Sequence, residues 1–517
     1  MKSNMKKHIL SFLNKSYLLL CFLLVLSCNK AKNKIQQTDS KPNIVLIYMD
    51  DLGYGDVGFN GGEIATPHID NLANGGMVFE NGYASSATCT PSRYALLTGM
   101  YPWRKKDAKI LTGTAPLLID ENQETIAKVL KKAGYTTGIV GKWHLGLGNG
   151  TLNWNKQIAL GPNQVGFDHS YIMAATQDRV PTVYIENGNV VNLDPNDPIE
   201  VSYEENFIGE PTALDHPELV EMKWHHTHNN SIVNGIPRIG FMKGGTNAKW
   251  VDTTMSKTFL KEAQRFVTDN KDNPFFLYFA LHQPHVPRTP NPKFVGKSGM
   301  GPRGDVIMEA DWTIGQLIST LEEKNILNNT LIIFTSDNGP VLNDGYYDDA
   351  VEKLGSHKPW GEFSGGKYSL LEAGTHIPLL TYWKGNIEPG VSKALVSQLD
   401  ILASLSDLVG ESITKTDSKN LLSTFLGKSS VGRTELVIEA MSKTALRKDE
   451  WVMIPPHKGP KVMKSQNIVT GSLGDYQLYN LINDIGEQEN LAQSNASKLH
   501  EMIKVFEDIK GEDKKEN

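Results

Sequence analysis

The sequence predicts an α/β protein built on a doubly wound, mostly parallel sheet, with a smaller C-terminal α+β subdomain. Short apolar runs typical of buried strands occur at residues 44–49, 135–140, 275–280, 331–335 and 377–383. Stretches with helical periodicity lie between or after them, at residues 124–132, 256–270, 306–324 and 399–408. Strands that alternate with helices in this way predict a sheet covered by helices on both faces.

The alternation fades after about residue 410. Weaker candidate elements follow, with strands at residues 436–438, 451–454 and 476–480 and a helix at 498–509. We therefore predict a catalytic domain over residues 43–410 and a C-terminal subdomain over residues 411–517.

The N-terminus has the features of an export signal. Four lysines precede an apolar run from Tyr17 to Leu26, which is too short to cross a bilayer. Cys28 follows Ser27 at the end of this run, as in the lipobox of bacterial lipoproteins, although Val25 stands at the usual leucine position. We predict a signal peptide over residues 1–27 and a lipidated cysteine with a linker over 28–42. The expected location is the bacterial cell envelope, in the periplasm or at the outer membrane, with simple secretion as the alternative.

The composition limits the partners of the chain. Loss of residues 1–27 removes four lysines and no acidic residue, which moves the formal net charge from −6 to −10. An acidic protein has no electrostatic reason to bind nucleic acid, and an anionic substrate must be held by local cations. The 39% hydrophobic content is typical of a folded domain.

Chemically versatile residues follow four of the predicted strands. They are Asp50 and Asp51, Lys142 and His144, His285, and Asp337 and Asn338. Ligands of open α/β sheets bind outside the carboxyl ends of the strands, so these groups are expected to meet in one site.

The carboxylates and the amide in this set are hard oxygen ligands. Asp50, Asp51, Asp337 and Asn338 favour one calcium ion, or less readily magnesium, over zinc. Either pair of residues taken alone also fits a turn at the end of a strand.

Cys89 is the only cysteine left for the folded domain once residues 1–27 are removed and Cys28 is lipidated, so it has no disulfide partner within that domain. It stands just before a short predicted helix at residues 92–97, with Arg93 close by. From position alone it could be an ordinary cysteine nucleophile with a lowered pKa.

At this point the chain resembles the type I, formylglycine-dependent sulfatases of the alkaline phosphatase superfamily. Their C-x-P-S-R signature is matched by Cys89-Thr90-Pro91-Ser92-Arg93. Further blocks in the family order are residues 50–56, 97–99, 141–146 and 365–367, Glu372, and residues 478–481 and 490–492. The similarity spans residues 43–493, and His376 departs from it because these enzymes usually carry arginine there.

The resemblance implies a mechanism. A formylglycine-generating or sulfatase-maturing enzyme would oxidise Cys89 to formylglycine, whose hydrated diol would bind calcium and attack the sulfur. Asp337 would accept the nucleophile's proton, His285 would protonate the departing sugar oxygen, and His144 would act as base in sulfate release. Arg93, Lys142 and Lys367 would hold the sulfate oxygens, and Cys89 would join the four oxygen-donor residues as a metal ligand.

The expected function is therefore hydrolysis of sulfate esters in a sulfated carbohydrate, either a polysaccharide or its oligosaccharides. A phosphonate monoester or phosphodiester hydrolase of the same superfamily is one alternative. Others are a non-catalytic glycan-binding surface lipoprotein and a conventional cysteine hydrolase.

Several further residues have no assigned role at this stage. His282 fits either substrate contact or a structural hydrogen bond, and the histidine-rich loop 223–228 fits a polar surface loop, a substrate contact or a second metal site. The role of His376 is open. The tryptophans that could stack on a sugar, or equally pack in the core or its rim, are Trp143, Trp224, Trp250 and Trp360.

Overall fold

The computed structural model describes residues 41–511. The predicted signal peptide, Cys28 and the linker as far as residue 40 lie outside this range. Among the described residues, no helix combines the length and the apolar character needed to span a bilayer.

A ten-stranded sheet forms the centre of the fold. Its strands, in spatial order, are β14 (Gly390–Ser397), β2 (Met77–Tyr83), β13 (Leu379–Tyr382), β12 (Thr330–Ser336), β1 (Asn43–Asp50), β11 (Phe275–Pro284), β3 (Thr136–Lys142), β4 (His169–Met173), β5 (Tyr184–Glu186) and β6 (Asn189–Val190). Strands β12, β1, β11, β3 and β4 run parallel, and β13 and β5 run antiparallel to their neighbours. The predicted fold class, a mostly parallel α/β sheet, is confirmed.

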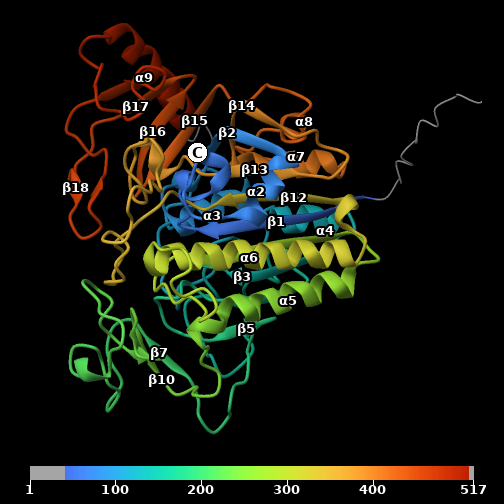
Figure 1. Ribbon diagram of the computed structural model, residues 1–517, viewed down its shortest axis with the longest axis vertical. Coiled ribbons are helices and arrows are strands. Elements are labelled where there is room, and N and C mark those ends of the chain that lie inside the picture. Colours follow the sequence, from blue (N-terminus) through green and yellow to red (C-terminus); the bar gives the residue numbers. More distant parts are fainter. Residues whose placement is uncertain (1–40, 512–517) are drawn as a thin grey trace, which may run out of the picture. The chain divides into compact units, whose positions relative to one another are not determined.

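Helices cover both faces of the sheet because alternate residues of the buried strands point to opposite sides. Ile44, Leu46 and Tyr48 of β1 join one hydrophobic core, while Val45 and Ile47 join the other. The first core includes residues from α3 (Cys89–Thr98), α4 (Ile126–Lys132) and α7 (Ile401–Leu408). The second includes residues from α2 (Pro67–Asn74), α5 (Met255–Asn270) and α6 (Gly301–Glu323), and α5 and α6 lie side by side across the sheet (Figure 1).

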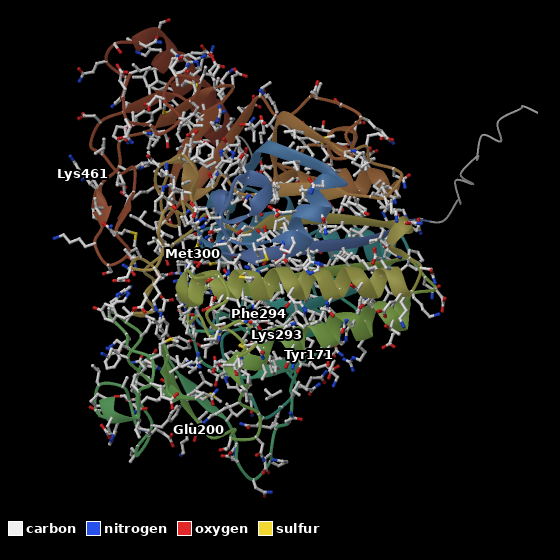
Figure 2. The ribbon with its side chains drawn as sticks, viewed as in Figure 1. Tyr171, Glu200, Lys293, Phe294, Met300 and Lys461 are labelled. Atoms are coloured by element: carbon white, nitrogen blue, oxygen red, sulfur yellow. The ribbon has the colours of Figure 1, made fainter. Side chains whose placement is uncertain are left out.

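The C-terminal part is a separate antiparallel sheet, as expected. Its strands, in order, are β15 (Glu435–Ala440), β16 (Lys443–Lys448), β17 (Trp451–Ile454) and β20 (Gln477–Asn480), and α9 (Ala496–Gly511) packs against β16 and β17. A hairpin of β18 (Val462–Met463) and β19 (Ile468–Val469) projects from it. Figure 2 marks Lys461, just before this hairpin.

Two further small sheets and a short helix complete the fold. The sheets pair β7 (Glu200–Ser202) with β10 (Phe241–Lys243) and β8 (Ile232–Val233) with β9 (Ile236–Pro237), and the helix is α8 (Leu422–Phe425). Glu200 marks the first of these sheets in Figure 2, far from Lys461.

Several elements differ from their predicted bounds. Helix α6 begins at Gly301 rather than at residue 306, because Pro302 fits the first turn of a helix and Arg303 is anchored there by Asp56. The strand expected at residues 377–383 is the antiparallel β13. Strand β2 was not predicted, because Glu80-Asn81-Gly82 at its centre interrupts the apolar run.

Candidate active site

The residues predicted to bind the metal converge at the ends of β1 and β12. Asp50, Asp51, Asp337 and Asn338 are all buried, and the side chains of the three aspartates and Cys89 offer donor atoms within 4.8 Å of one another. The Cys89 Sγ lies 3.6 Å from Asp50 Oδ1 and 4.0 Å from Asp51 Oδ1. The parallel pairing of β1 with β12, in which Met49 lies beside Ser336, brings the two groups to one edge.

The backbone holds Asp51 in a conformation that L-residues seldom adopt. Its φ is 64°, and its amide donates to Asp337 Oδ1 at 3.1 Å. The next amide, of Leu52, donates to Ser336 Oγ at 3.0 Å. These two hydrogen bonds tie the turn after β1 to the end of β12, and such strained positions are concentrated at functional sites.

The predicted sulfate-binding cations fall into two groups. Lys142 Nζ lies 2.7 Å from both oxygens of Asp50, and Arg93 Nη2 lies 2.8 Å from Asp337 Oδ2. Both cations are fully buried and neither lines the pocket described below. Lys367 does line it, with its Nζ 2.8 Å from Asp51 Oδ2 and 2.8 Å from a carboxylate oxygen of Asp344.

The donor set fits a hard divalent cation. The buried Asn338 Oδ1 has no hydrogen-bond partner among the described residues, while the Asn338 amide nitrogen donates to Asp51 Oδ1 at 2.8 Å. Burial raises the pKa of Asp50 well above its ordinary value although Lys142 opposes this. A cation that needs several oxygen ligands would satisfy the free amide oxygen and the crowded carboxylates together.

Cys89 is the first residue of α3, which begins three residues before the predicted start at residue 92, and Arg93 follows one turn later on the same face. Every residue of this helix is buried. Burial and the Asp337 carboxylate raise the pKa of the Cys89 thiol well above its ordinary value. This direction disfavours the alternative of an ordinary cysteine nucleophile with a lowered pKa, because burial penalises the thiolate.

Two histidines present one free ring nitrogen each. His144 Nε2 lies 3.0 Å from the Leu111 carbonyl oxygen and donates to it, which leaves the buried Nδ1 as an acceptor without a partner among the described residues. Burial and Lys142 lower the pKa of His144 well below its ordinary value, so its ring is neutral. His285 Nδ1 donates to the Val286 carbonyl at 2.6 Å, so Nε2 is the ring nitrogen left for the pocket and carries a proton only when the ring is charged. Burial lowers the pKa of His285 well below its ordinary value.

A pocket of about 360 Å³ opens over Cys89 and is lined by His144, His285 and Lys367. Outside the loop 223–228, sequence reasoning missed five polar residues that line it, namely Asp178, Arg179, Asp344, Tyr368 and Gln466. Asp178 and Arg179 follow β4, a strand that was not predicted, and the others lie on loops without a motif. Only Tyr368 could have been identified from the sequence, because it directly follows Lys367 in the block of residues 365–367.

Comparisons with known proteins agree with this geometry. The family model described as Sulfatase matches residues 42–411. The chain belongs to the sulfatase family. This sulfatase is 45% identical over 494 residues to an N-acetylgalactosamine-6-O-sulfatase of Bacteroides thetaiotaomicron, which covers 94% of this chain and 97% of that protein.

Two more comparisons extend the match. Human arylsulfatase A is 33% identical over 371 residues, covering 71% of this sulfatase and 64% of the human protein. A solved structure from a study of glycosaminoglycan metabolism by B. thetaiotaomicron superposes with a TM-score of 0.90 at 46% identity, over 91% of this chain and 100% of the other. The predicted family is confirmed, and the chain is an enzyme that hydrolyses sulfate esters.

The unassigned histidines of the sulfatase now have positions. His226 and His228 of the loop 223–228 line the pocket, and His228 Nε2 lies 2.9 Å from Asp178 Oδ2. His282 packs against Phe259 outside the pocket, with its ring centre 5.8 Å from the phenyl centre.

His376 is a buried structural residue. Its Nδ1 lies 3.1 Å from Glu372 Oε2, its Nε2 donates to the Glu80 carbonyl at 2.7 Å, and its ring stacks on Phe363 with centres 4.1 Å apart. The departure from the family's arginine therefore lies outside the residues that line the pocket.

The four tryptophans differ in burial. Trp143 and Trp250 are core residues, at 0% and 2% exposure. Trp224 packs against a small cluster that includes Tyr346, whereas Trp360 lines a neighbouring cavity.

Proposed function

We propose that this sulfatase removes 6-O-sulfate from N-acetylgalactosamine units of a sulfated glycan. The observation that carries the proposal is the 45% identity to the N-acetylgalactosamine-6-O-sulfatase of B. thetaiotaomicron, which extends over 97% of that protein. A match of this length includes the loops that line the pocket as well as the sheet that supports them.

Asp50, Asp51, Asp337 and Asn338, together with residue 89, would hold the calcium ion. Calcium would supply positive charge that orients and activates the oxygen nucleophile at position 89. Cys89 would become formylglycine through a formylglycine-generating or sulfatase-maturing enzyme. The support for both assignments is the hard, buried donor set and the family signature around Cys89.

Proton transfer would be divided between two faces of the pocket. Asp337, within 4.8 Å of the Cys89 sulfur, would accept the proton of the nucleophile, and His285 Nε2 would give a proton to the departing sugar oxygen. A sulfate anion in the pocket would favour the protonated form of His285. The neutral His144, with its unpartnered Nδ1, would accept a proton from the group at position 89.

The cations would act at two distances from the sulfate. Lys367 lines the pocket and would bind a sulfate oxygen directly. Lys142 would hold Asp50 in place, and Arg93 would hold Asp337. Because all four side chains are buried, the positive charges of the two cations would still act on the sulfate without direct contact. The proposal differs here from the expectation drawn from the resemblance, in which all three cations hold sulfate oxygens.

The lipid anchor and the cell-envelope location remain proposals from the N-terminal sequence. Detergent partitioning of the wild type and Cys28→Ala tests them: the wild type should enter the detergent phase and the variant should not. Equal partitioning of the two would argue against lipidation.

The substrate assignment is tested by sulfate release. Purified, matured enzyme should release sulfate from N-acetylgalactosamine 6-sulfate much faster than from the 4-sulfate isomer. An aryl phosphonate monoester and an aryl phosphodiester, assayed in parallel, separate the phosphorus alternatives. Preference for either phosphorus ester, or for the 4-sulfate, would overturn the assignment.

A further inference from the structure

A second cavity, of about 400 Å³, adjoins the active-site pocket. Gln466 lines both cavities, and its side-chain nitrogen lies 2.9 Å from His226 Nε2 and 3.4 Å from Asp344 Oδ1, two residues of the active-site pocket. A backbone hydrogen bond also links the two linings: the amide of Lys367, which lines the active-site pocket, donates to the carbonyl of Pro340, which lines the second cavity, at 2.9 Å. The second cavity therefore lies next to the active-site pocket, with Gln466 between the two.

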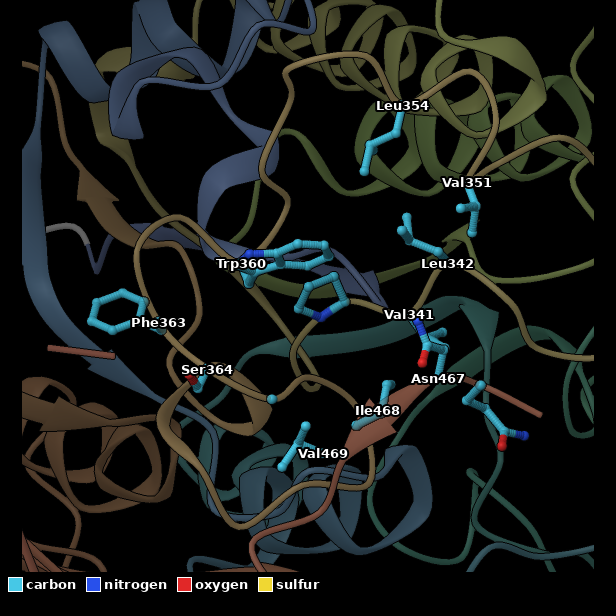
Figure 3. Close-up of a pocket in the computed structure, with 13 residues that line it drawn as sticks. Val341, Leu342, Val351, Leu354, Trp360, Phe363, Ser364, Asn467, Ile468 and Val469 are labelled. Carbon is cyan, nitrogen blue, oxygen red and sulfur yellow. The ribbon is translucent and has the colours of Figure 1, made fainter. Parts of the chain in front are cut away.

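The wall of this cavity contains an aromatic ring, that of Trp360, whose packing against other aromatic side chains does not explain its position. Trp360 is half-buried, and its indole makes no hydrogen bond or ring contact with another residue of the described chain. Phe363, by contrast, packs on His376 and Tyr54. Figure 3 shows Trp360 among the residues that line the cavity, with the Leu342 and Ile468 side chains also around it.

The rim of the cavity is exposed and mixed in character. Val351 and Val469 line it with 43% and 51% of their surfaces exposed. Asn467 also lines it, and its exposed side-chain amide has no hydrogen-bond partner within residues 41–511. An apolar floor with free polar groups at the edge is typical of a ligand site.

We propose that this cavity is a second sugar subsite, which binds the glycan unit next to the sulfated residue by stacking it on Trp360. A pyranose ring carries C–H groups on its faces and hydroxyls around its edge. The C–H groups, with small positive partial charges, match the negative face of the indole, and the edge hydroxyls can reach the Asn467 and Gln466 amides. The inference rests on the proposed function and adds that the enzyme recognises oligosaccharides beyond the single sulfated unit.

The test compares two substrates with the same sulfated sugar. One is N-acetylgalactosamine 6-sulfate, and the other is a trisaccharide from chondroitin 6-sulfate with this unit at its non-reducing end. Trp360→Ala should lower kcat/KM for the trisaccharide by about tenfold or more, the factor that corresponds to about 1.4 kcal/mol. It should leave kcat/KM for the monosaccharide within about twofold, and Trp360→Phe should retain part of the preference.

The control is Trp383→Ala. Trp383 follows β13, which runs antiparallel to β12. The carboxyl end of β13 is therefore at the opposite end of the strands from the active site, which lies at the carboxyl end of β12. This variant should keep the wild-type ratio between the two substrates, and thermal unfolding checks that both alanine variants are folded.

The outcomes separate the inference from the proposed function. Loss of neither activity in Trp360→Ala, or an equal loss of both, would overturn the subsite and leave the proposed function intact. If Trp360→Ala lowered kcat/KM for an aryl sulfate as much as for the trisaccharide, the cavity would be a general apolar site and not a sugar subsite, which would overturn the inference. Absence of sulfate release from both sugars by the wild type would overturn the proposed substrate and the inference with it.

Discussion

Lys142 Nζ lies 2.7 Å from each carboxylate oxygen of Asp50, and the two side chains are 0% and 1% exposed. The pair forms where β1 and β3 end on either side of β11. A buried carboxylate that loses its only close lysine keeps its desolvation cost without the compensating charge. This ion pair therefore links the stability of the fold to the integrity of the active site.

Lys142→Met should consequently both destabilise the enzyme and inactivate it. Removing one partner of a buried pair costs about 3–5 kcal/mol of unfolding free energy, and the misplaced Asp50 should reduce kcat by orders of magnitude. Denaturant unfolding and sulfate release measure the two effects. Lys257→Met on the exposed surface of α5 is the matched control, and equal stability of the two variants would contradict this account of Lys142.

Metal removal should abolish sulfate release and lower the melting temperature. Asp50, Asp51 and Asp337 crowd three buried carboxylates together, so a bound divalent ion should stabilise the native state by mass action. Dialysis against a chelator, followed by calcium, should remove and restore activity. Full activity in metal-free enzyme, verified by elemental analysis, would refute the metal assignment.

His285→Ala should discriminate between leaving groups. A departing sugar oxygen needs a proton, whereas an aryl oxide leaves readily without one, and general acid catalysis contributes roughly 10²–10⁴-fold. The variant should lose that factor on N-acetylgalactosamine 6-sulfate and much less on an aryl sulfate. A uniform loss on both substrates would instead indicate that His285 only positions the sulfate.

Glu439 makes the stability dependent on pH. Burial raises its pKa to about 7, and one of its carboxylate oxygens has no partner among the described residues. Because the unfolded carboxyl ionises near pH 4.5, this group favours the folded state at low pH, and its contribution declines as the pH rises toward about 7. Glu439→Gln should therefore be more stable than the wild type at pH 8, by about 1–3 kcal/mol, and gain little at pH 4. Thermal unfolding at both pH values tests this, and an equal difference at both would contradict it.

Much of the site could be predicted because its residues follow long apolar strands. Asp50, Lys142, His285 and Asp337 each come within a few residues of a strand that the sequence marks clearly, and parallel pairing brings those ends together. The order of the motifs around Cys89 then identified the family.

The remaining pocket residues could not be predicted, because tertiary contacts place them. Asp344 becomes part of the site through Lys367, and Gln466 reaches it from a hairpin of the C-terminal part. No local periodicity encodes such contacts between distant loops. The positions of Arg93 and Lys142 beneath the pocket likewise depend on which carboxylates they meet in the folded chain.

The central claim is that a chemically converted Cys89 at the buried carboxylate cluster performs sulfate ester hydrolysis. Peptide mass spectrometry of the fragment that contains residue 89, on the same preparation that is assayed for sulfate release, tests it most directly. The account predicts that activity rises in proportion to the fraction of aldehyde at this position and is absent in Cys89→Ala. Full activity in protein that carries only the unmodified thiol would contradict it.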